Sequence, residues 1–331
     1  MEAETRYHPS ADQLALASTI DESLMALLPL SRLHTSYGED PKTWSGLDEI
    51  GIFGITASEE QGGSGLGPVE EALIVLSLGR HLAAPSVLAT IGAVHGRTEG
   101  DRPGSGLRGR RVAAAYRRAD RIIIIDDTAA DLVLLREPTG AGLYELSSSA
   151  SGRPLDDRLW LAGLREATPG AGVEFAAGTP LARFDTNQLL RLRLIDAAAL
   201  AGISQAALDM AVAYAGIRTQ FGRPIGTFQA VKHHCANMAI AARCARDQTS
   251  FAAVAVAEGR DDAALQVECA LSVAGWAALD NSGKNIQIHG GIGFSDEADP
   301  HLCLKRAQLL IAIAGGLEAA SARIAKIKRV D

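Results

Sequence analysis

The segment with the most specific pattern in this chain runs Arg218-Thr-Gln-Phe-Gly-Arg-Pro-Ile-Gly-Thr-Phe-Gln-Ala-Val-Lys232. It places an arginine, an aromatic ring, a tight glycine turn, a proline and the start of a new helix in one short stretch. A guanidinium group pairs with phosphate through a planar fork, and a neighbouring ring can pack against a heterocycle. The same residues are equally typical of a helix–turn–helix corner with a solvated arginine. Taken alone, the segment leaves both interpretations open.

A second segment, Gln287-Ile-His-Gly-Gly-Ile-Gly-Phe294, lies further along the chain. Glycines at the end of a helix expose backbone amides and let a ligand approach the backbone closely. A plain helix C-cap has the same pattern. This segment is therefore also ambiguous when it is read by itself.

Long helices are expected around both segments. The spacing of apolar residues predicts one helix over 189–217 and another over 228–258. A third is expected to start after the N-cap residues Asp261-Asp262 and to end near 289–291. A fourth is expected to start at Pro300 and to run toward 328, with a break at Gly315-Gly316. Small residues in the first helix should let neighbouring helices approach closely.

The rest of the chain divides into two parts of different character. Before about residue 96, helices are expected over 12–28, from Ser45 or Gly46 through Ile50, and over 70–81. Short apolar runs then predict strands at 122–125, 132–135, 143–146 and 173–175. We therefore expect an α + β, mostly α, fold with three domains. These are an N-terminal helical domain (1–96), a central β domain (97–185) and a C-terminal four-helix bundle (186–331).

Composition narrows the class of protein. The 331 residues are 47 % hydrophobic and 21 % charged, which excludes wholesale disorder. A net charge of −7 argues against nucleic acid as a partner. The four cysteines lack zinc or disulfide spacing and are expected to be free thiols in a reducing compartment. The N-terminus lacks a signal-peptide core and no window resembles a membrane span, so we expect a cytoplasmic protein without membrane contact.

Two further patterns invite a functional interpretation and are better explained by structure. The glycines of residues 62–67 do not have the spacing of a nucleotide-binding loop, and we expect a connecting turn. The acidic string Asp296, Glu297 and Asp299 with His301 lacks calcium-loop spacing and directly precedes an expected helix start. We therefore expect helix-entry chemistry there and no metal site.

The two motif segments together resemble the acyl-CoA dehydrogenase family, in the pattern Rx₂FGxPIxxFQxxK followed by QIHGGxGF. The stretches Trp44–Gly51 and Glu59–Arg80 are similar to the first helical domain of the same family. The resemblance covers both ends of the chain and is weak in the middle. It implies the three-domain fold described above, FAD as cofactor and an acyl-CoA thioester as substrate.

Family members remove the α-proton of the thioester with a glutamate, while the flavin accepts a hydride from the β-carbon. By resemblance the two family positions for that glutamate fall on Gly315 and Leu192, and neither residue is a carboxylate. Asp196 and Glu318 lie a few residues away, on other helix faces, and are not expected to substitute. The central region lacks the family's EPGAGSD-like turn and Trp-Ile-Thr/Ser strand around the flavin ring, and it is expected to be shortened.

The residues that the resemblance assigns to the ADP half of FAD are retained. By resemblance, Arg218 neutralises pyrophosphate charge, Phe221 packs by the adenosine and the glycine amides donate hydrogen bonds. The expected cofactor-binding residues are Arg218, Phe221, Gln229, Gln287, Gly290 and Gly291, with no catalytic residue and no metal ligand. This pattern is similar to the shortened non-catalytic subunits of two-gene (α₂β₂) steroid-CoA dehydrogenases of actinobacteria.

The leading hypothesis is therefore a subunit that pairs with a full-length homologue carrying the base and the flavin pocket. Two alternatives remain open at this point. One is a self-sufficient homo-oligomeric enzyme with a displaced base, Glu318 or Glu297. The other is a flavin-free scaffold that only stabilises its partner.

Overall fold

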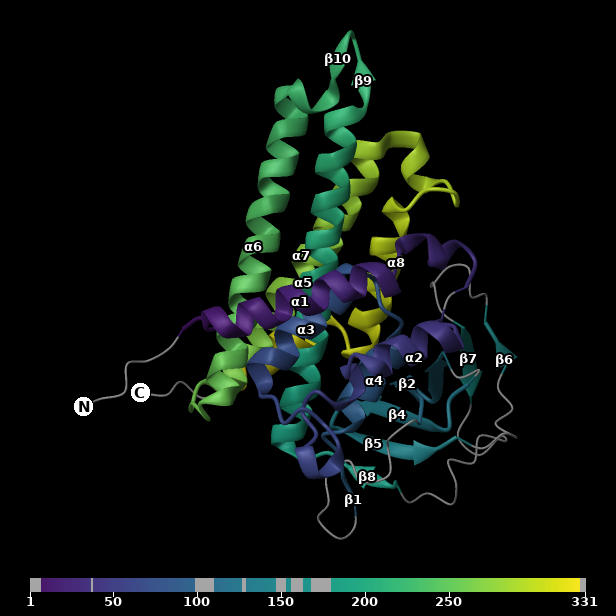
Figure 1. The fold of residues 1–331 in the computed structure, drawn as a ribbon, viewed down its shortest axis with the longest axis vertical. Coiled ribbons are helices and arrows are strands. Elements are labelled where there is room, and N and C mark those ends of the chain that lie inside the picture. The colour runs from purple at the N-terminus through teal and green to yellow at the C-terminus, as the bar shows by residue number, and fades with distance from the viewer. Residues whose placement is uncertain are drawn as a thin grey trace, which may run out of the picture.

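The computed structural model describes residues 7–36, 38–98, 110–126, 129–146, 153–155, 163–167 and 180–327. Long helices stand upright as a bundle, shorter N-terminal helices cross it, and a β-sheet lies at the lower right (Figure 1). This arrangement confirms the predicted α + β, mostly helical class. The three domain boundaries remain a prediction.

The N-terminal helices are α1 (Ala11–Leu27), α2 (Pro41–Glu49), α3 (Pro68–Arg80) and α4 (Pro85–Ala93), with short 3-10 turns η1 (Leu30–His34), η2 (Ile52–Gly54) and η3 (Glu59–Gln61). The predictions for α1 and α3 are confirmed to within two residues. Helix α2 begins before the predicted Ser45 or Gly46, because the Asp40 carboxylate accepts hydrogen bonds from the Lys42 and Thr43 amides. Helix α4 is not among the predicted helices, because all nine of its residues are buried and leave no polar face to set a period.

Within the described residues the sheet has eight strands, in the order β1-β8-β5-β4-β2-β3-β7-β6. Its strands are β1 (Arg97–Thr98), β2 (Val112–Arg118), β3 (Arg121–Ile125), β4 (Leu132–Glu137), β5 (Gly140–Glu145), β6 (Arg153–Pro154), β7 (Leu164–Ala167) and β8 (Ala182–Arg183). The predicted strands at 122–125, 132–135 and 143–146 correspond to β3, β4 and β5. The predicted strand at 173–175 lies outside the described residues.

Strand β2 is the main strand that the sequence pattern missed. It contains three consecutive alanines, so it lacks the β-branched run that marks β3. It nevertheless lies at the centre of the sheet, antiparallel to β3 and parallel to β4. Its place is decided by these two partners, which the local sequence does not reveal.

The C-terminal part contains α5 (Thr186–Ile217), α6 (Gln229–Ala257), α7 (Ala263–His289), α8 (Pro300–Ile313) and α9 (Leu317–Ile324). The four predicted bundle helices are confirmed, including the break at Gly315-Gly316. Both glycines have φ near +90°, a conformation that an L-residue adopts at a cost. The connecting elements are β9 (Thr219–Gln220), β10 (Arg223–Pro224), η6 (Ile225–Thr227) and η7 (Gly290–Phe294).

Helices α3 and α5 cross at very short range through glycine. A Cβ at Gly79 would lie 2.1 Å from the Ala199 carbonyl oxygen, and one at Gly202 would lie 2.0 Å from the Leu76 oxygen. Each glycine therefore admits the backbone of the opposite helix. This contact confirms the predicted close approach and joins the N-terminal helices to the bundle.

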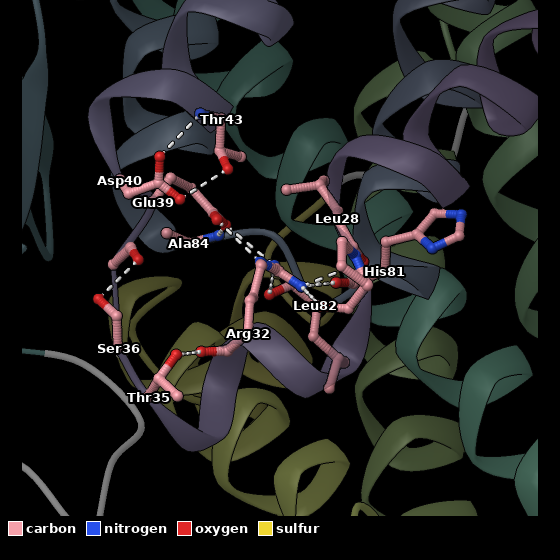
Figure 2. Close-up of polar contacts among 12 residues, drawn as sticks. Leu28, Arg32, Thr35, Ser36, Glu39, Asp40, Thr43, His81, Leu82 and Ala84 are labelled. Atoms are coloured by element: carbon pink, nitrogen blue, oxygen red, sulfur yellow. Dashed lines mark hydrogen bonds and ion pairs between the residues drawn. The ribbon is translucent and has the colours of Figure 1, made fainter.

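A buried guanidinium holds the N-terminal segments together (Figure 2). Arg32 donates from Nε and Nη2 to the two carboxylate oxygens of Glu39, at 2.8 and 2.9 Å. It also donates to the carbonyl oxygens of Leu28, Pro29, His81 and Leu82. Glu39 Oε1 accepts a further hydrogen bond from the Ala84 amide at 2.9 Å. The pair links η1, the start of α2 and the α3–α4 turn.

The prediction that no segment resembles a membrane span is wrong by length and composition. Among the described residues, Ala11–His34 and Thr186–Ile217 are long and apolar enough, and the bent pair α8–α9 would make a third. In α5, 72 % of the apolar window is buried inside the protein, as expected for a helix in the middle of a core. In Ala11–His34 only 11 % of the apolar window is buried inside the protein.

Candidate functional site

The first motif segment forms a hairpin at the free end of the bundle, at the top of Figure 1. Helix α5 ends at Ile217, and β9 pairs with β10 in antiparallel register. The two residues between these strands, Phe221 and Gly222, both have positive φ, at 51° and 78°. Positive φ at both central residues is typical of a type I′ hairpin turn. The segment is thus a helix–hairpin–helix corner.

Phe221 is unusual within this turn. A non-glycine residue in the left-handed region costs about 1–2 kcal/mol, and the ring is 92 % exposed. Its only ring contact among the described residues is edge-on with Phe228, at 6.1 Å between centroids. Backbone strain together with an exposed aromatic ring is typical of a position kept for binding.

The second motif segment lies at the same end of the bundle. Helix α7 ends at His289, whose ring stacks on Tyr214 of α5 with 4.1 Å between centroids. Beneath these rings, residues of α5, α6 and α7 form a separate apolar cluster that includes Ala215, Met238 and Ile288. The structure therefore brings the two motif segments together, although residues 233–286 separate them along the chain.

All six predicted cofactor residues are exposed at this end of the bundle: Arg218, Phe221, Gln229, Gln287, Gly290 and Gly291. Within the described part of the chain, the Arg218 side chain has no hydrogen-bond or ion-pair partner. A Cβ added at Gly290 or Gly291 would meet nothing within 4 Å, and Gly290 has φ of +67°. A free guanidinium, a ring and open glycine backbone fit the phosphate-linked adenosine end of a dinucleotide. We call these six residues the dinucleotide face.

The two positions where the family would place its base lie elsewhere, beside the sheet. Gly315 lines a cavity of about 150 Å³ between β2, β4, α5, α8 and α9. Leu192 is buried and lines an adjoining pocket, which shares Arg136 and Ile313 with that cavity. The structure therefore brings the two positions into one region, and neither of them carries an acid.

Ion pairs surround this cavity. Arg136 of β4 pairs with Asp196 of α5 at 2.7 Å. Glu268 of α7 pairs through Oε1 with two arginines: Arg193 lies 3.0 Å away as an ion pair, and Arg323 donates a hydrogen bond of 2.7 Å. Burial raises the pKa of Asp196, while Arg136 opposes that rise. Asp196 lines the adjoining pocket together with Leu192, but it is held there by Arg136 and is not a free base.

A flavin ring does not fit this region. Pockets for drug-sized ligands typically occupy about 300–1,000 Å³, so a cavity of about 150 Å³ lined by arginines is too small for an isoalloxazine. The dinucleotide face lies at the other end of α5. Arg193 and Arg218 are 25 residues apart in this helix, or about 38 Å at 1.5 Å per residue. One dinucleotide cannot contact both places.

The remaining acidic candidates lie outside the cavity. Glu318 is exposed in the first turn of α9, and Glu297 is exposed and accepts a hydrogen bond from the Ser295 hydroxyl at 2.6 Å. Asp299 stands at the N-cap position of α8 but makes no side-chain hydrogen bond to the helix, and it pairs instead with His34 at 2.7 Å. In the described ranges no group of three metal-ligating side chains is found.

Sequence reasoning missed the arginine-rich lining of the cavity. Arg136, Arg193 and Arg323 come from β4, α5 and α9, and Glu268 comes from α7. No motif joins them, because each residue is a single charge within an otherwise ordinary helix or strand. The only signal was the absence of a carboxylate at Gly315 and Leu192.

Comparison with known proteins gives a consistent result. The family model described as acyl-CoA dehydrogenase, C-terminal domain, matches residues 182–328, and the one for the N-terminal domain matches residues 10–97. The chain is 31 % identical over 316 residues to acyl-CoA dehydrogenase FadE34 of Mycobacterium tuberculosis, covering 82 % of this chain but only 40 % of FadE34. It is 29 % identical to acyl-CoA dehydrogenase IpdE2 of Mycolicibacterium smegmatis, covering 83 % of this chain and 84 % of IpdE2.

Solved structures show the same fold. The ChsE4–ChsE5 complex from Mycobacterium tuberculosis has a TM-score of 0.75 at 21 % identity, covering 97 % of this chain and 98 % of the matched chain. The Tcur3481–Tcur3483 steroid ACAD has a TM-score of 0.74 at 22 % identity, covering 95 % and 96 % of the two chains. These similarities confirm the predicted fold.

Proposed function

Because the chain belongs to the acyl-CoA dehydrogenase family of FAD-binding flavoproteins, we propose that it is one subunit of a heteromeric acyl-CoA dehydrogenase. In this proposal the dinucleotide face binds the ADP half of an FAD whose flavin lies in a partner chain. The partner also supplies the base that removes the α-proton of the acyl-CoA thioester. When bound, FAD supplies hydride acceptance at the β-carbon.

The observation that carries the proposal is the separation of two half-sites on one chain. The dinucleotide face is open and has the chemistry of a phosphate and adenosine site. The region of the missing base is lined by ion-paired arginines and lies about 38 Å away along α5. A cofactor held at the dinucleotide face must therefore present its flavin to another molecule.

Each residue of the dinucleotide face then has a defined task. Arg218 offers a guanidinium fork to the pyrophosphate, which is the strongest neutral-pH contact this surface can make. Phe221 offers a ring for the adenosine, and the glycine backbone at 290–291 offers amides at short range. Gln229 and Gln287 add amide donors and acceptors at the first turn of α6 and the last turn of α7.

The exposed apolar side chains around the face support burial against a partner. Ile217 is 79 % exposed, Phe294 is 75 % exposed and Ile292 is 53 % exposed. Clustered exposed apolar residues mark interaction sites more often than free surface. Two similar structures are named as pairs of different chains, which supports a heteromeric assembly. One of them is named a steroid ACAD, and on that basis we propose a steroid side-chain CoA ester as substrate.

The test is co-expression of the full chain with a longer homologue from the same genome. We expect flavin absorbance and acyl-CoA-dependent reduction of an electron acceptor in the complex, and neither in the isolated chain. Arg218→Ala should deplete flavin by about tenfold or more, because a charge-assisted phosphate contact is lost. Arg243→Ala is the matched control, since Arg243 is exposed on α6 and pairs only locally with Asp247.

Three results would reject the proposal. Stoichiometric flavin and turnover in the isolated chain would favour a self-sufficient enzyme, and loss of that turnover in Glu318→Gln or Glu297→Gln would identify its base. Full flavin content in the Arg218→Ala complex would favour a scaffold without a cofactor contact. Failure to form a complex with any longer homologue would remove the heteromeric role.

A further inference from the structure

The cavity beside Gly315 is built as a cationic pocket. Of its lining residues, four are arginines and one is acidic: Arg117, Arg136, Arg193, Arg323 and Glu137. Arg117 pairs with Glu137 at 2.6 Å, and Arg136 pairs with Asp196. These two arginines are therefore neutralised one to one.

The other two arginines share a single counter-ion. Arg193 forms an ion pair with Oε1 of Glu268, and Arg323 donates a hydrogen bond to the same oxygen; Glu268 is 2 % exposed. The pocket thus holds one positive charge more than its carboxylates balance. Burial lowers the pKa of Arg193, and the charges of Arg323 and Arg136 lower it further, while Glu268 opposes this. The two guanidinium groups therefore repel each other, and the carboxylates of Glu268 and Asp196 oppose that repulsion. Oε2 of Glu268 is itself without a hydrogen-bond partner among the described residues.

Arg323 also retains an unused donor. Its Nη2 atom is buried and has no hydrogen-bond partner among the described residues. A buried donor without an acceptor costs about 1–3 kcal/mol, which native structures rarely tolerate without a role. The adjoining N-terminus of α9, after Gly315-Gly316, adds a partial positive charge on the same side.

We propose that this cavity is a binding site for a small organic monocarboxylate, held by Arg193 and Arg323. The inference does not depend on the proposed function, because the cavity belongs to this chain alone. One bound carboxylate would balance the excess charge through charge-assisted hydrogen bonds to the guanidinium groups that line the cavity.

The lining and the size of the cavity select the class of ligand. Besides the arginines the lining includes Leu189, Pro138, Ala312, Ile313 and Ala319. These side chains suit a short hydrocarbon tail and not a second charged oxygen. The volume of about 150 Å³ is below the range of drug-sized ligand pockets, so the tail must be short. Partly exposed Arg117 and Glu137 at the rim leave a route from solvent.

The experiment is isothermal titration calorimetry of the purified full chain at constant ionic strength. The probes are sodium butyrate, its neutral isostere butyramide and sodium phosphate. We expect saturable binding of one butyrate per chain, no binding of butyramide and much weaker binding of phosphate. Arg323→Gln should weaken butyrate binding by about tenfold, since Glu268 keeps Arg193 as its partner. Arg243→Gln makes the same charge change outside the cavity and should bind as the parent does.

A second variant separates charge from folding. Ala319→Leu places extra methyl groups in the cavity and leaves every charge in place, so it should abolish binding. Equal binding of butyramide would overturn the role of charge, and equal or tighter binding of phosphate would overturn the choice of a carboxylate. Parent-like butyrate binding in Ala319→Leu would overturn the location, whatever the fate of Arg323→Gln.

Discussion

Replacing Glu39 with alanine tests the buried ion pair of Figure 2 most directly. The Glu39 side chain is 1 % exposed and that of Arg32 is 11 % exposed. Removing one partner of a buried pair costs about 3–5 kcal/mol. Arg32 would keep four backbone carbonyl contacts, so the cost of losing the pair should lie at the lower end, about 3 kcal/mol. The Ala84 amide would lose its acceptor, which adds about 1 kcal/mol.

We therefore expect Glu39→Ala to lower the free energy of unfolding by about 4 kcal/mol. The assay is urea denaturation followed by far-ultraviolet circular dichroism, with midpoints compared at equal slopes. The exposed pair Arg243–Asp247 supplies the control, and Asp247→Ala should cost only about 0.5 kcal/mol.

The double variant Arg32→Met/Glu39→Leu makes the reasoning refutable. It removes both charges and leaves apolar groups of similar size, which is often close to neutral for buried pairs. The double variant should therefore be more stable than Glu39→Ala alone. Destabilisation equal to the sum of Arg32→Met and Glu39→Leu would show that the two side chains do not act as a pair.

Substitutions at three single sites make further tests. Gly79→Ala should destabilise the chain by about 1–3 kcal/mol, because its Cβ meets the Ala199 carbonyl. Gly216→Ala is the control and should be neutral or stabilising, because the space around this residue of α5 is open. Thermal melts that rank the two variants the other way would contradict the α3–α5 contact. Burial raises the pKa of Asp126 from 3.8 to about 7, so between these values the folded chain holds a proton that the unfolded chain has lost, and the free energy of unfolding contributed by this group falls as pH rises. Asparagine tolerates the left-handed φ of 57° at this position, so Asp126→Asn should remove the pH dependence of the free energy of unfolding, measured by denaturation at several values from pH 4 to 7. An unchanged pH dependence in the variant would show that Asp126 is not its source. Phe221→Asn should relieve about 1 kcal/mol of backbone strain and raise the melting temperature of the chain, yet lower the flavin content of the co-expressed complex. If the melting temperature and the flavin content both rise, the ring does not contribute to cofactor binding.

Local sequence was enough to predict most of the helical part of this fold. Residues that typically start or stop helices mark the ends of α5, α7 and α8. Examples are Pro300 as the first residue of α8 and Gly290 directly after α7. The motifs at 218–232 and 287–294 are likewise recognisable from the sequence, because each of them is contiguous. Their shared location on the bundle follows from the packing of α5 against α7, and their contact with FAD remains a proposal.

The remaining features of the fold and the site depend on tertiary packing, because they arise from contacts between residues that are distant along the chain. Helix α4 has no exposed face, and β2 acquires its place from β3 and β4, so neither leaves a periodic pattern. The shared use of Glu268 by Arg193 and Arg323 arises only where α5, α7 and α9 meet. A window of sequence records which side chains are charged or apolar, whereas the folded chain determines which of them are paired, strained or left without a partner.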